Sequence, residues 1–230
     1  RANVFGGIGA VVKTDGSVVR KRANLAVSLV PPAIRGNRFP TSFGGGLRAV
    51  REQFQAAEKG ALADAKSGKL TTSFAINGPA DIDRALALTA EFGLRTVLRG
   101  GEEHSEFTKE LKEAGIGVAL GPLSTSSNER TYASIKQLAE AGVPLAFGFA
   151  DNGNAPATLR ESAALAFRGG LDRATAWNAV TKTAAQLTGA GDRVGRVATG
   201  LDADLVLWSG DPLLISSSPV AVYIGGAKTQ

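Results

Sequence analysis

The sequence contains no cysteine, no methionine and only one histidine among its 230 residues. Without cysteine the chain forms no disulfide bond and offers no thiolate ligand to a metal ion. A single histidine does not suffice to identify a Ser/His/Asp set for nucleophilic catalysis in the sequence. The lack of cysteine is compatible with a cytoplasmic and with an exported protein, so the compartment stays open.

Long apolar runs are also absent, since none reaches the roughly 18 residues that a membrane-spanning helix needs. We therefore expect no transmembrane segment. The composition, 43% apolar and 20% charged, is that of a globular protein. The net charge is +5, and the basic residues are dispersed apart from Arg-Lys-Arg at 20–22, which we interpret as a solvated turn. Because no aromatic-rich basic face accompanies them, the sequence predicts no nucleic-acid partner.

The chain begins with Arg1 and has no methionine, so residue 1 is not expected to be a translation start. A processed chain or a fragment of a longer protein is expected, and a signal peptide could have been removed with the preceding residues. Both alternatives stay open.

From residue 71 onward, short β-type segments alternate with segments that have apolar residues at helical spacing. Strands are predicted at 71–77, 94–99, 116–120 and 143–149, and helices at 80–92, 102–114 and 128–141. Strands that start about 20 to 27 residues apart suit parallel pairing with crossover helices, in a (β/α)8 barrel or an open doubly wound sheet. No glycine-rich phosphate loop of the dinucleotide-binding spacing follows the first of these strands.

The rest of the chain divides into an opening third and a closing segment of different texture. The opening third predicts a hairpin at 8–19 around Asp15-Gly16, a strand at 24–30 and an amphipathic helix at 45–66. Helices are predicted at 157–170 and 172–189. Beyond residue 190, β-type residues punctuated by Gly and Asp indicate short antiparallel strands. We therefore expect a partial barrel over 1–190 and a small β segment over 191–230.

The closing segment carries the most specific motif of the chain. The helix NAVTKTAAQLTG is followed by DRVGRVATGLDADLVLWSGDPL and a final strand with YIGG. This run resembles the end of amidohydrolase-superfamily enzymes, in particular imidazolonepropionase-like amidohydrolases, whose Gly-x-x-Ala-Asp-Leu-Val motif is matched at 200–206. The segments at 80–103 and 2–16 are similar to other parts of that family. The strand that bears the family's His-x-His metal pair falls outside these residues.

This resemblance implies a distorted (β/α)8 barrel with one or two divalent ions at the carboxyl ends of its strands, activating water against an amide or cyclic C–N bond. It also implies histidine ligands at the ends of the fifth and sixth strands. In this sequence, the first position holds Ala75, Ile76 or Asn77, and the second holds Arg99 or one of the two glycines after it. A guanidinium is always charged and cannot bind a cation.

Three polar residues near the predicted strand ends remain to be interpreted. Asp151 falls where the resemblance implies a catalytic aspartate, and we interpret it as a vestigial turn or cap acid, with a general base as the alternative. Asn77 is interpreted as an Asx-type turn residue and His104 as an exposed or capping histidine, with a displaced metal ligand as the alternative for His104. Together, Asn77, Arg99 and Asp151 would suit a polar or anionic ligand.

Three functions are therefore weighed. The favoured one is an amidohydrolase-like chain whose metal site has decayed, kept as a structural or interaction subunit with no cofactor. The second is an active metal-dependent hydrolase that uses one divalent metal such as zinc, with ligands supplied by a missing N-terminal half or another chain. The third is a small-molecule binding barrel. In each case we expect another chain or a missing N-terminal segment to complete the barrel.

Overall fold

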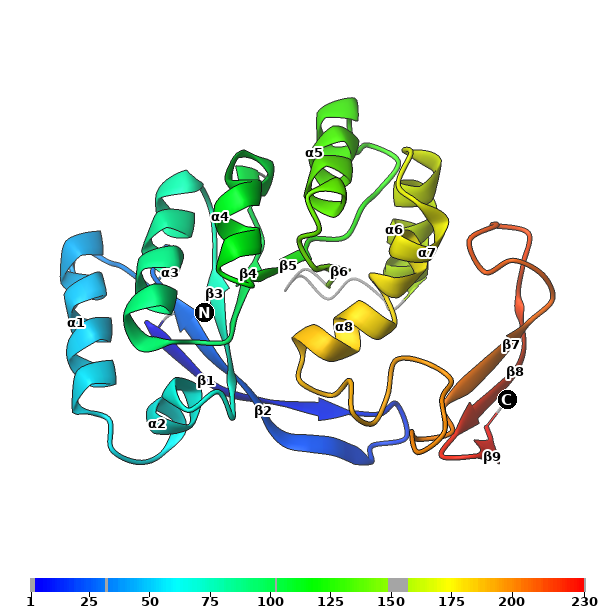
Figure 1. The fold of residues 1–230 in the computed structure, drawn as a ribbon, viewed down its shortest axis with the longest axis horizontal. Helices are drawn as coiled ribbons and strands as arrows, with labels where there is room; N and C mark the ends of the chain where they lie inside the picture. Colours follow the sequence, from blue (N-terminus) through cyan, green and yellow to red (C-terminus); the bar gives the residue numbers. More distant parts are fainter. Residues whose placement is uncertain (1–2, 32, 102, 149–156, 230) are drawn as a thin grey trace.

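The computed structural model describes residues 3–31, 33–101, 103–148 and 157–229. Its larger sheet has six strands in the order β1-β2-β3-β4-β5-β6 (Figure 1). The strands are β1 (Phe5–Val12), β2 (Val18–Ser28), β3 (Thr71–Ala75), β4 (Thr96–Arg99), β5 (Gly117–Leu120) and β6 (Leu145–Phe147). β1 is antiparallel to β2, and every later neighbour is parallel.

The strand order distinguishes between the two fold classes that the sequence left open. From β2 to β6 each strand pairs with the next one along the chain, with no reversal of order. A doubly wound sheet reverses its order at a switch point and carries helices on both faces. Here the helices α1, α3, α4, α5 and α6 stand in a row along one side (Figure 1). In the described residues β1 and β6 are the two edges of the sheet, so the arrangement is a barrel that is not closed.

The helices follow the strands, and those between β2 and β6 are crossover connections. They are α1 (Phe43–Ala56), α2 (Ala61–Lys66), α3 (Pro79–Phe92), α4 (Thr108–Glu113), α5 (Glu129–Glu140), α6 (Ala157–Arg168), α7 (Arg173–Asn178) and α8 (Lys182–Leu187), with the 3₁₀ turn η1 (Glu103–Phe107) before α4. Ser42 and Asn128 cap α1 and α5 through their side chains. Gly93 ends α3 with φ of 64°, as the sequence predicted for a helix-closing glycine. None of the helices in the described ranges is long and apolar enough to cross a membrane.

Three predicted helices are interrupted, and each break has a local cause. The helix predicted at 45–66 stops at Ala57, which is extended, and restarts after Gly60, whose φ is 81°. The one predicted at 102–114 begins as the 3₁₀ turn η1. The one predicted at 172–189 is divided at Thr181, where φ is −128° and ψ is −96°. Helical spacing of apolar residues continued across these breaks, so periodicity alone did not reveal them.

The core lies between the sheet and the row of helices. Its largest fully buried side chains include Phe54, Leu98 and Leu138. Phe54 of α1 stacks on Phe92 of α3 at 5.1 Å between ring centroids, and contacts Phe5 of β1 edge-on at 6.3 Å. This aromatic cluster joins the first hairpin to the first two long helices.

A second, three-stranded antiparallel sheet closes the chain. It consists of β7 (Leu205–Trp208), β8 (Pro219–Ile224) and β9 (Ala227–Lys228). The antiparallel strands predicted after residue 190 are thus present, while the division into two domains at that residue stays a prediction. Trp208 of β7 meets Trp177 of α7 edge-on at 6.5 Å, and the Arg160 guanidinium of α6 lies 4.7 Å from the Trp208 ring centroid.

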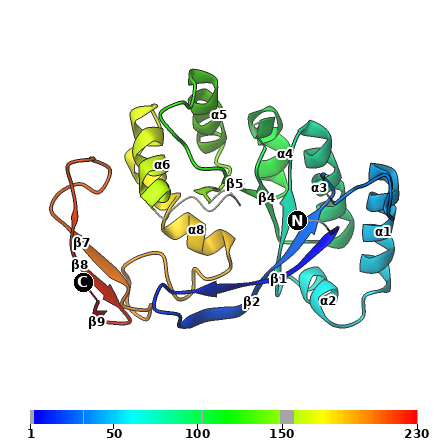
Figure 2. The same ribbon diagram turned by 180° about the vertical axis from the view of Figure 1, so that it is seen from behind.

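The β1–β2 hairpin crosses beneath the helices and reaches this second sheet (Figure 2). Lys13, near its tip, forms ion pairs of 2.7 and 2.9 Å with Asp202 and Asp204, and these carboxylates raise the pKa of Lys13. The prediction of a solvated turn at residues 20–22 is wrong, because they lie within β2. Arg20 and Arg22 instead pair with Asp192 and Asp64 from other elements.

Candidate functional site

A cavity of about 390 Å³ opens where β2, β3, β4, β5 and β6 end. Parallel strands in register bring their carboxyl ends to one rim, so residues far apart in the sequence meet there. The wall includes Ala75, Asn77, Arg99, Ala119 and Gly148. In barrels built from βα units this rim is where ligands bind and catalysis takes place.

The turn after β3 sets the position of Asn77. The Asp81 carboxylate, in the first turn of α3, accepts hydrogen bonds from the backbone N–H groups of Asn77 and Gly78 at 2.9 and 3.3 Å. Asp81 also forms an ion pair with Arg84. The sequence predicted an Asx-type turn in which the Asn77 side chain accepts the hydrogen bond. The acceptor that the structure records in this turn is the Asp81 carboxylate. Asn77 is exposed at the cavity wall.

Arg99 is the last residue of β4 and lies beside Ala75 and Ala119 in the register of the sheet. Its carbonyl oxygen accepts a hydrogen bond of 2.9 Å from the N–H of Ile76, which holds the two strand ends together. The structure thus brings Arg99 and Asn77 to the same cavity. Asp151, the third residue of the predicted set, lies outside the described residues.

The two glycines after Arg99 lie where a side chain would be strained. Gly100 and Gly101 have φ of 75° and 76°, in the region that other residues rarely adopt. A Cβ atom on Gly101 would lie 2.9 Å from Ile76 Cγ2 and 3.1 Å from His104 Cε1. A side chain at position 101 would therefore strain the backbone and displace Ile76 or His104.

Gly101→Ala is therefore expected to lower the free energy of unfolding by about 2 to 3 kcal/mol, measured by urea denaturation. Gly68→Ala is the matched control, because Gly68 has φ of 73° but nothing within 4 Å of an added Cβ. Gly68→Ala should lower the free energy of unfolding by about 1 kcal/mol, the cost of placing alanine at a positive φ. Equal losses in the two variants would contradict the close packing around Gly101.

The single histidine lies directly behind this turn. His104, in η1, has none of its surface exposed, and neither ring nitrogen has a hydrogen-bond partner within the described residues. Burial lowers its pKa to about 4, and the nearby charge of Glu103 opposes that shift only in part. The favoured prediction of an exposed or capping histidine is wrong, because η1 folds the ring inward against Gly101.

A neighbouring cavity of about 540 Å³ was not predicted from the sequence. It shares Gly100, Leu120 and Gly121 with the first cavity and continues between η1 and the start of α5. Polar side chains, among them Glu106 and Arg130, line it. The run of hydroxyl residues at 124–127 was the signal in the sequence, since part of that run lines this cavity.

A set of parallel strands in sequential order, helices along one side, and a cavity at the carboxyl ends define a (β/α) barrel of the kind that metal-dependent hydrolases use. The sequence profile of the amidohydrolase family matches residues 77–228, more than half of the chain. The chain belongs to the amidohydrolase family, as the motif at 200–206 indicated.

Relatives and solved structures agree with this assignment. The imidazolonepropionase of Anaeromyxobacter dehalogenans strain 2CP-1 is 34% identical over 166 residues, which cover 66% of this chain and 38% of that protein. An amidohydrolase of Hapsidospora irregularis is 42% identical over 64 residues, 28% of this chain and 6% of that protein. The chain thus spans well under two thirds of these relatives.

The crystal structure of an amidohydrolase from Thermotoga maritima MSB8 superposes with a TM-score of 0.85 at 25% identity. The match covers 100% of this chain and 69% of that one. The predicted fold class, a partial barrel with a small C-terminal β segment, is confirmed.

Amidohydrolases generally use a divalent metal ion such as zinc, and the described strand ends do not fit one. In ranges 3–148 and 157–229, with their gaps at 32 and 102, no three His, Asp or Glu side chains are grouped so that they could hold a metal ion. Two polar side chains stand at the rim itself, the amide of Asn77 and the guanidinium of Arg99. The amide is a weak ligand for zinc-like ions, and the guanidinium carries a fixed positive charge and cannot bind a cation. His104 is turned away from solvent behind Gly101.

Proposed function

We propose that this chain is an amidohydrolase-family domain whose metal site has decayed, and that it serves as a structural or interaction subunit. The observation that carries the proposal is Arg99 at the end of β4, on the wall of the cavity where a catalytic ion would be expected. A fixed positive charge repels a divalent cation, most strongly where water is excluded. The glycines that follow Arg99 offer no alternative position for a ligand.

The resemblance to imidazolonepropionase supports the family and leaves the reaction open. That relative is more than twice the length of the matched region, which corresponds to 38% of it. An active hydrolase would need its ligands from residues outside this chain together with Asp151. Such a site would bypass Asn77 and Arg99 but would place the ion beside the Arg99 charge.

The partner in this proposal is whatever completes the barrel. Within the described residues, the edge strand β6 pairs only with β5, and an unpaired edge of a buried parallel sheet is costly to expose. Further residues of a longer protein, or another chain, would supply the missing strands.

The deciding measurement is the divalent-metal content of the protein that contains this chain, isolated without chelator or metal-affinity column. We expect far less than one equivalent per chain and no change on Asp151→Asn. One or more equivalents that are lost in Asp151→Asn would contradict the proposal and favour the active hydrolase. Lys109→Gln, on α4 away from the cavity, is the control for unspecific changes in metal content.

The small-molecule binding barrel is the second candidate, and one observation favours it. The cavity has kept a volume of about 390 Å³ with a guanidinium and an amide on its wall, instead of being filled by larger apolar side chains. A small-molecule binding barrel would have the same low metal content as a structural subunit. The two differ in ligand binding: for the binding barrel, a small dicarboxylate should raise the melting temperature, and Arg99→Gln should abolish the increase.

A further inference from the structure

A basic cavity of about 600 Å³ lies at the opposite rim of the sheet, where strands begin instead of ending. Its charged side chains are Arg20, Lys69, Arg95, Asp192 and Arg196. The amino-terminal rim of a barrel ordinarily serves stability and carries no active site. A concentration of cations there calls for a separate explanation.

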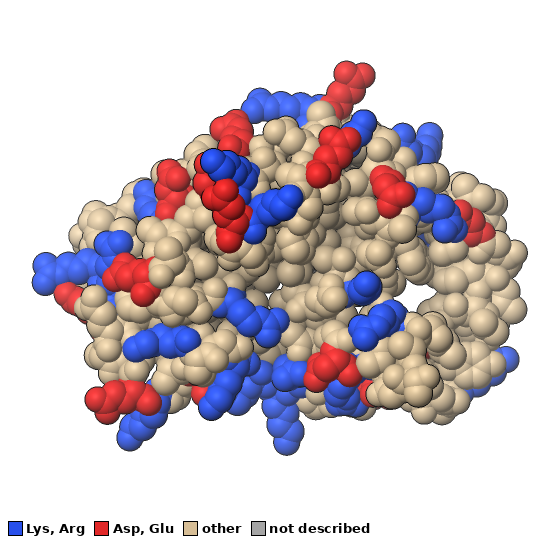
Figure 3. Space-filling view, in the orientation of Figure 1, with Lys and Arg blue, Asp and Glu red and all other residues tan. Residues whose placement is uncertain are grey.

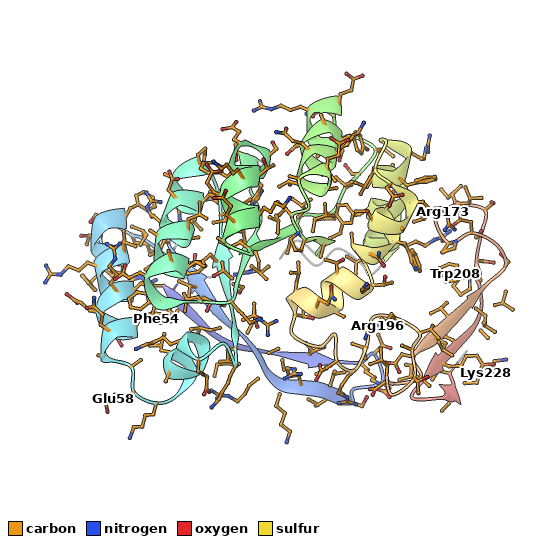
Figure 4. The ribbon with its side chains drawn as sticks, in the orientation of Figure 1. Phe54, Glu58, Arg173, Arg196, Trp208 and Lys228 are labelled. Atoms are coloured by element: carbon orange, nitrogen blue, oxygen red, sulfur yellow. The ribbon has the colours of Figure 1, made fainter. Side chains whose placement is uncertain are left out.

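The register of the sheet assembles this cavity from distant parts of the chain. Lys69 lies just before β3, and Arg95 lies just before β4. The carbonyl oxygen of Arg95 accepts a hydrogen bond of 2.7 Å from the N–H of Thr72, which keeps the starts of the two strands side by side. Arg196 comes from the segment between α8 and β7 (Figure 4), where its guanidinium donates to the carbonyl oxygen of Gly191 at 3.0 Å.

The cavity carries an uncompensated positive charge. Among the lining residues that the structure describes, the one carboxylate is that of Asp192. The Arg20 guanidinium already binds it at 2.9 Å to each oxygen, and this bond lowers the pKa of Asp192. Lys69, Arg95 and Arg196 form no ion pair within the parts of the chain that the structure describes. Figure 3 shows that Lys and Arg predominate over acidic residues along the lower half of the face it presents.

The wall also holds a buried hydroxyl group that lacks a partner. Thr71, the first residue of β3, is 4% exposed, and its Oγ1 has no hydrogen-bond partner in the described structure. It lies beside Gly189, where an added Cβ would be 3.9 Å from Thr71 Oγ1. A hydroxyl group can donate to an anion, and a buried polar group without a partner is unfavourable. Thr71 is thus a second, uncharged feature that points to a ligand.

We propose that this amino-end cavity binds a small molecule that bears phosphate groups. Three unpaired cations suit the multiple charge of a phosphorylated compound, and the Thr71 hydroxyl group supplies a directional donor. The cavity is open to solvent, and its volume of about 600 Å³ leaves room for a small molecule. None of the described residues that line the cavity is aromatic, whereas single-stranded nucleic acids are held by stacking on aromatic rings. The proposal does not depend on whether the carboxyl-end cavity is catalytic.

Pyrophosphate is the probe, titrated calorimetrically into the protein that contains this chain at constant ionic strength, with chloride as the reference anion. We expect saturable binding that weakens at least about tenfold in the double variant Lys69→Gln/Arg95→Gln. The matched control is Lys109→Gln/Arg168→Gln, which removes the same two charges from exposed positions on α4 and α6. It should bind within about twofold of the parent, because screening weakens distant charges.

Thr71→Val tests whether a specific hydrogen bond contributes to binding, because it leaves the charge of the cavity unchanged. It replaces the hydroxyl group by a methyl group of similar size, and we expect binding to weaken about threefold or more with no loss of stability. Arg99→Gln should leave pyrophosphate binding unchanged.

Four results would overturn the proposal. They are no saturable binding at millimolar pyrophosphate, equal weakening in the two double variants, loss of binding in Arg99→Gln, and tighter binding of a single-stranded oligonucleotide than of pyrophosphate. The second would indicate unspecific attraction, the third would place the anion in the carboxyl-end cavity, and the fourth would identify a nucleic-acid surface.

Discussion

Lowering the pH from 7.5 to 5 should reduce the free energy of unfolding of this chain by about 2 kcal/mol, and His104→Leu should remove that loss. In the folded chain burial holds the pKa of His104 at about 4, against 6.5 for an exposed imidazole. Between these two values the unfolded chain binds a proton that the folded chain does not bind. The stability that the neutral, buried ring contributes is therefore complete above pH 6.5. It is lost as the pH falls, and at pH 4 the loss of unfolding free energy is about 3 kcal/mol.

The composition of the chain makes this measurement specific. His104 is the only histidine, and no other side chain has an ordinary pKa between 5 and 7. The carboxyl groups whose pKa is lowered, among them Asp172 and Asp211, titrate below this range. Urea denaturation at a series of pH values gives the profile directly.

Two variants separate titration from packing. His104→Leu fills much of the same volume and removes both ring nitrogens that lack partners, so its stability should vary little from pH 7.5 to 5. His104→Gln keeps a buried polar group that does not titrate, and it should be less stable than the parent at pH 7.5 but equally flat. A parent profile that is already flat would mean that the ring is solvated.

Phe54→Ala is expected to lower the free energy of unfolding by about 3 to 5 kcal/mol. Phe54 has no exposed surface and contacts two other rings, so its removal leaves a cavity where α1, α3 and β1 meet (Figure 4). The neighbouring Phe92 and Phe5 also lose their aromatic contacts. Denaturation in guanidinium chloride at pH 7.5, where His104 is neutral, gives the value.

The control for truncation of an apolar side chain is Ile215→Ala, since Ile215 is 99% exposed. Its effect should stay within about 0.5 kcal/mol. A loss below 1 kcal/mol for Phe54→Ala would show that α1 is not packed on the sheet as described.

The parts of the fold that the sequence predicted are those that depend on neighbours along the chain. The hairpin around Asp15-Gly16 is correct, since Asp15 accepts from the N–H of Ser17 at 2.8 Å and Gly16 has φ of 86°. The alternation of strands and helices is correct for the same reason. The same alternation predicted that Asn77 and Arg99 lie close together, because neighbouring parallel strands bring their carboxyl ends to one edge independently of the helices that connect them.

The parts that the sequence did not predict depend on contacts between distant residues. The burial of His104 follows from the 3₁₀ turn that folds it behind Gly101, and no local pattern specifies that turn. The basic amino-end cavity combines Lys69, Arg95 and Arg196, which only the strand register and the segment after α8 bring together. For the basic residues of β2 the local sequence predicts a turn, because their partners, such as Asp192, are far away in the sequence.

The edge-on contact of Trp177 with Trp208 involves both tryptophans of the chain. All indole fluorescence therefore originates at one place, the junction of α7 with the C-terminal sheet, where the Arg160 guanidinium also lies over one ring. Emission reports the separation of that sheet from the barrel, while far-ultraviolet circular dichroism follows the helices of the barrel. A thermal scan recorded by both methods at once thus distinguishes a chain that unfolds as one unit from one that releases its last forty or so residues first.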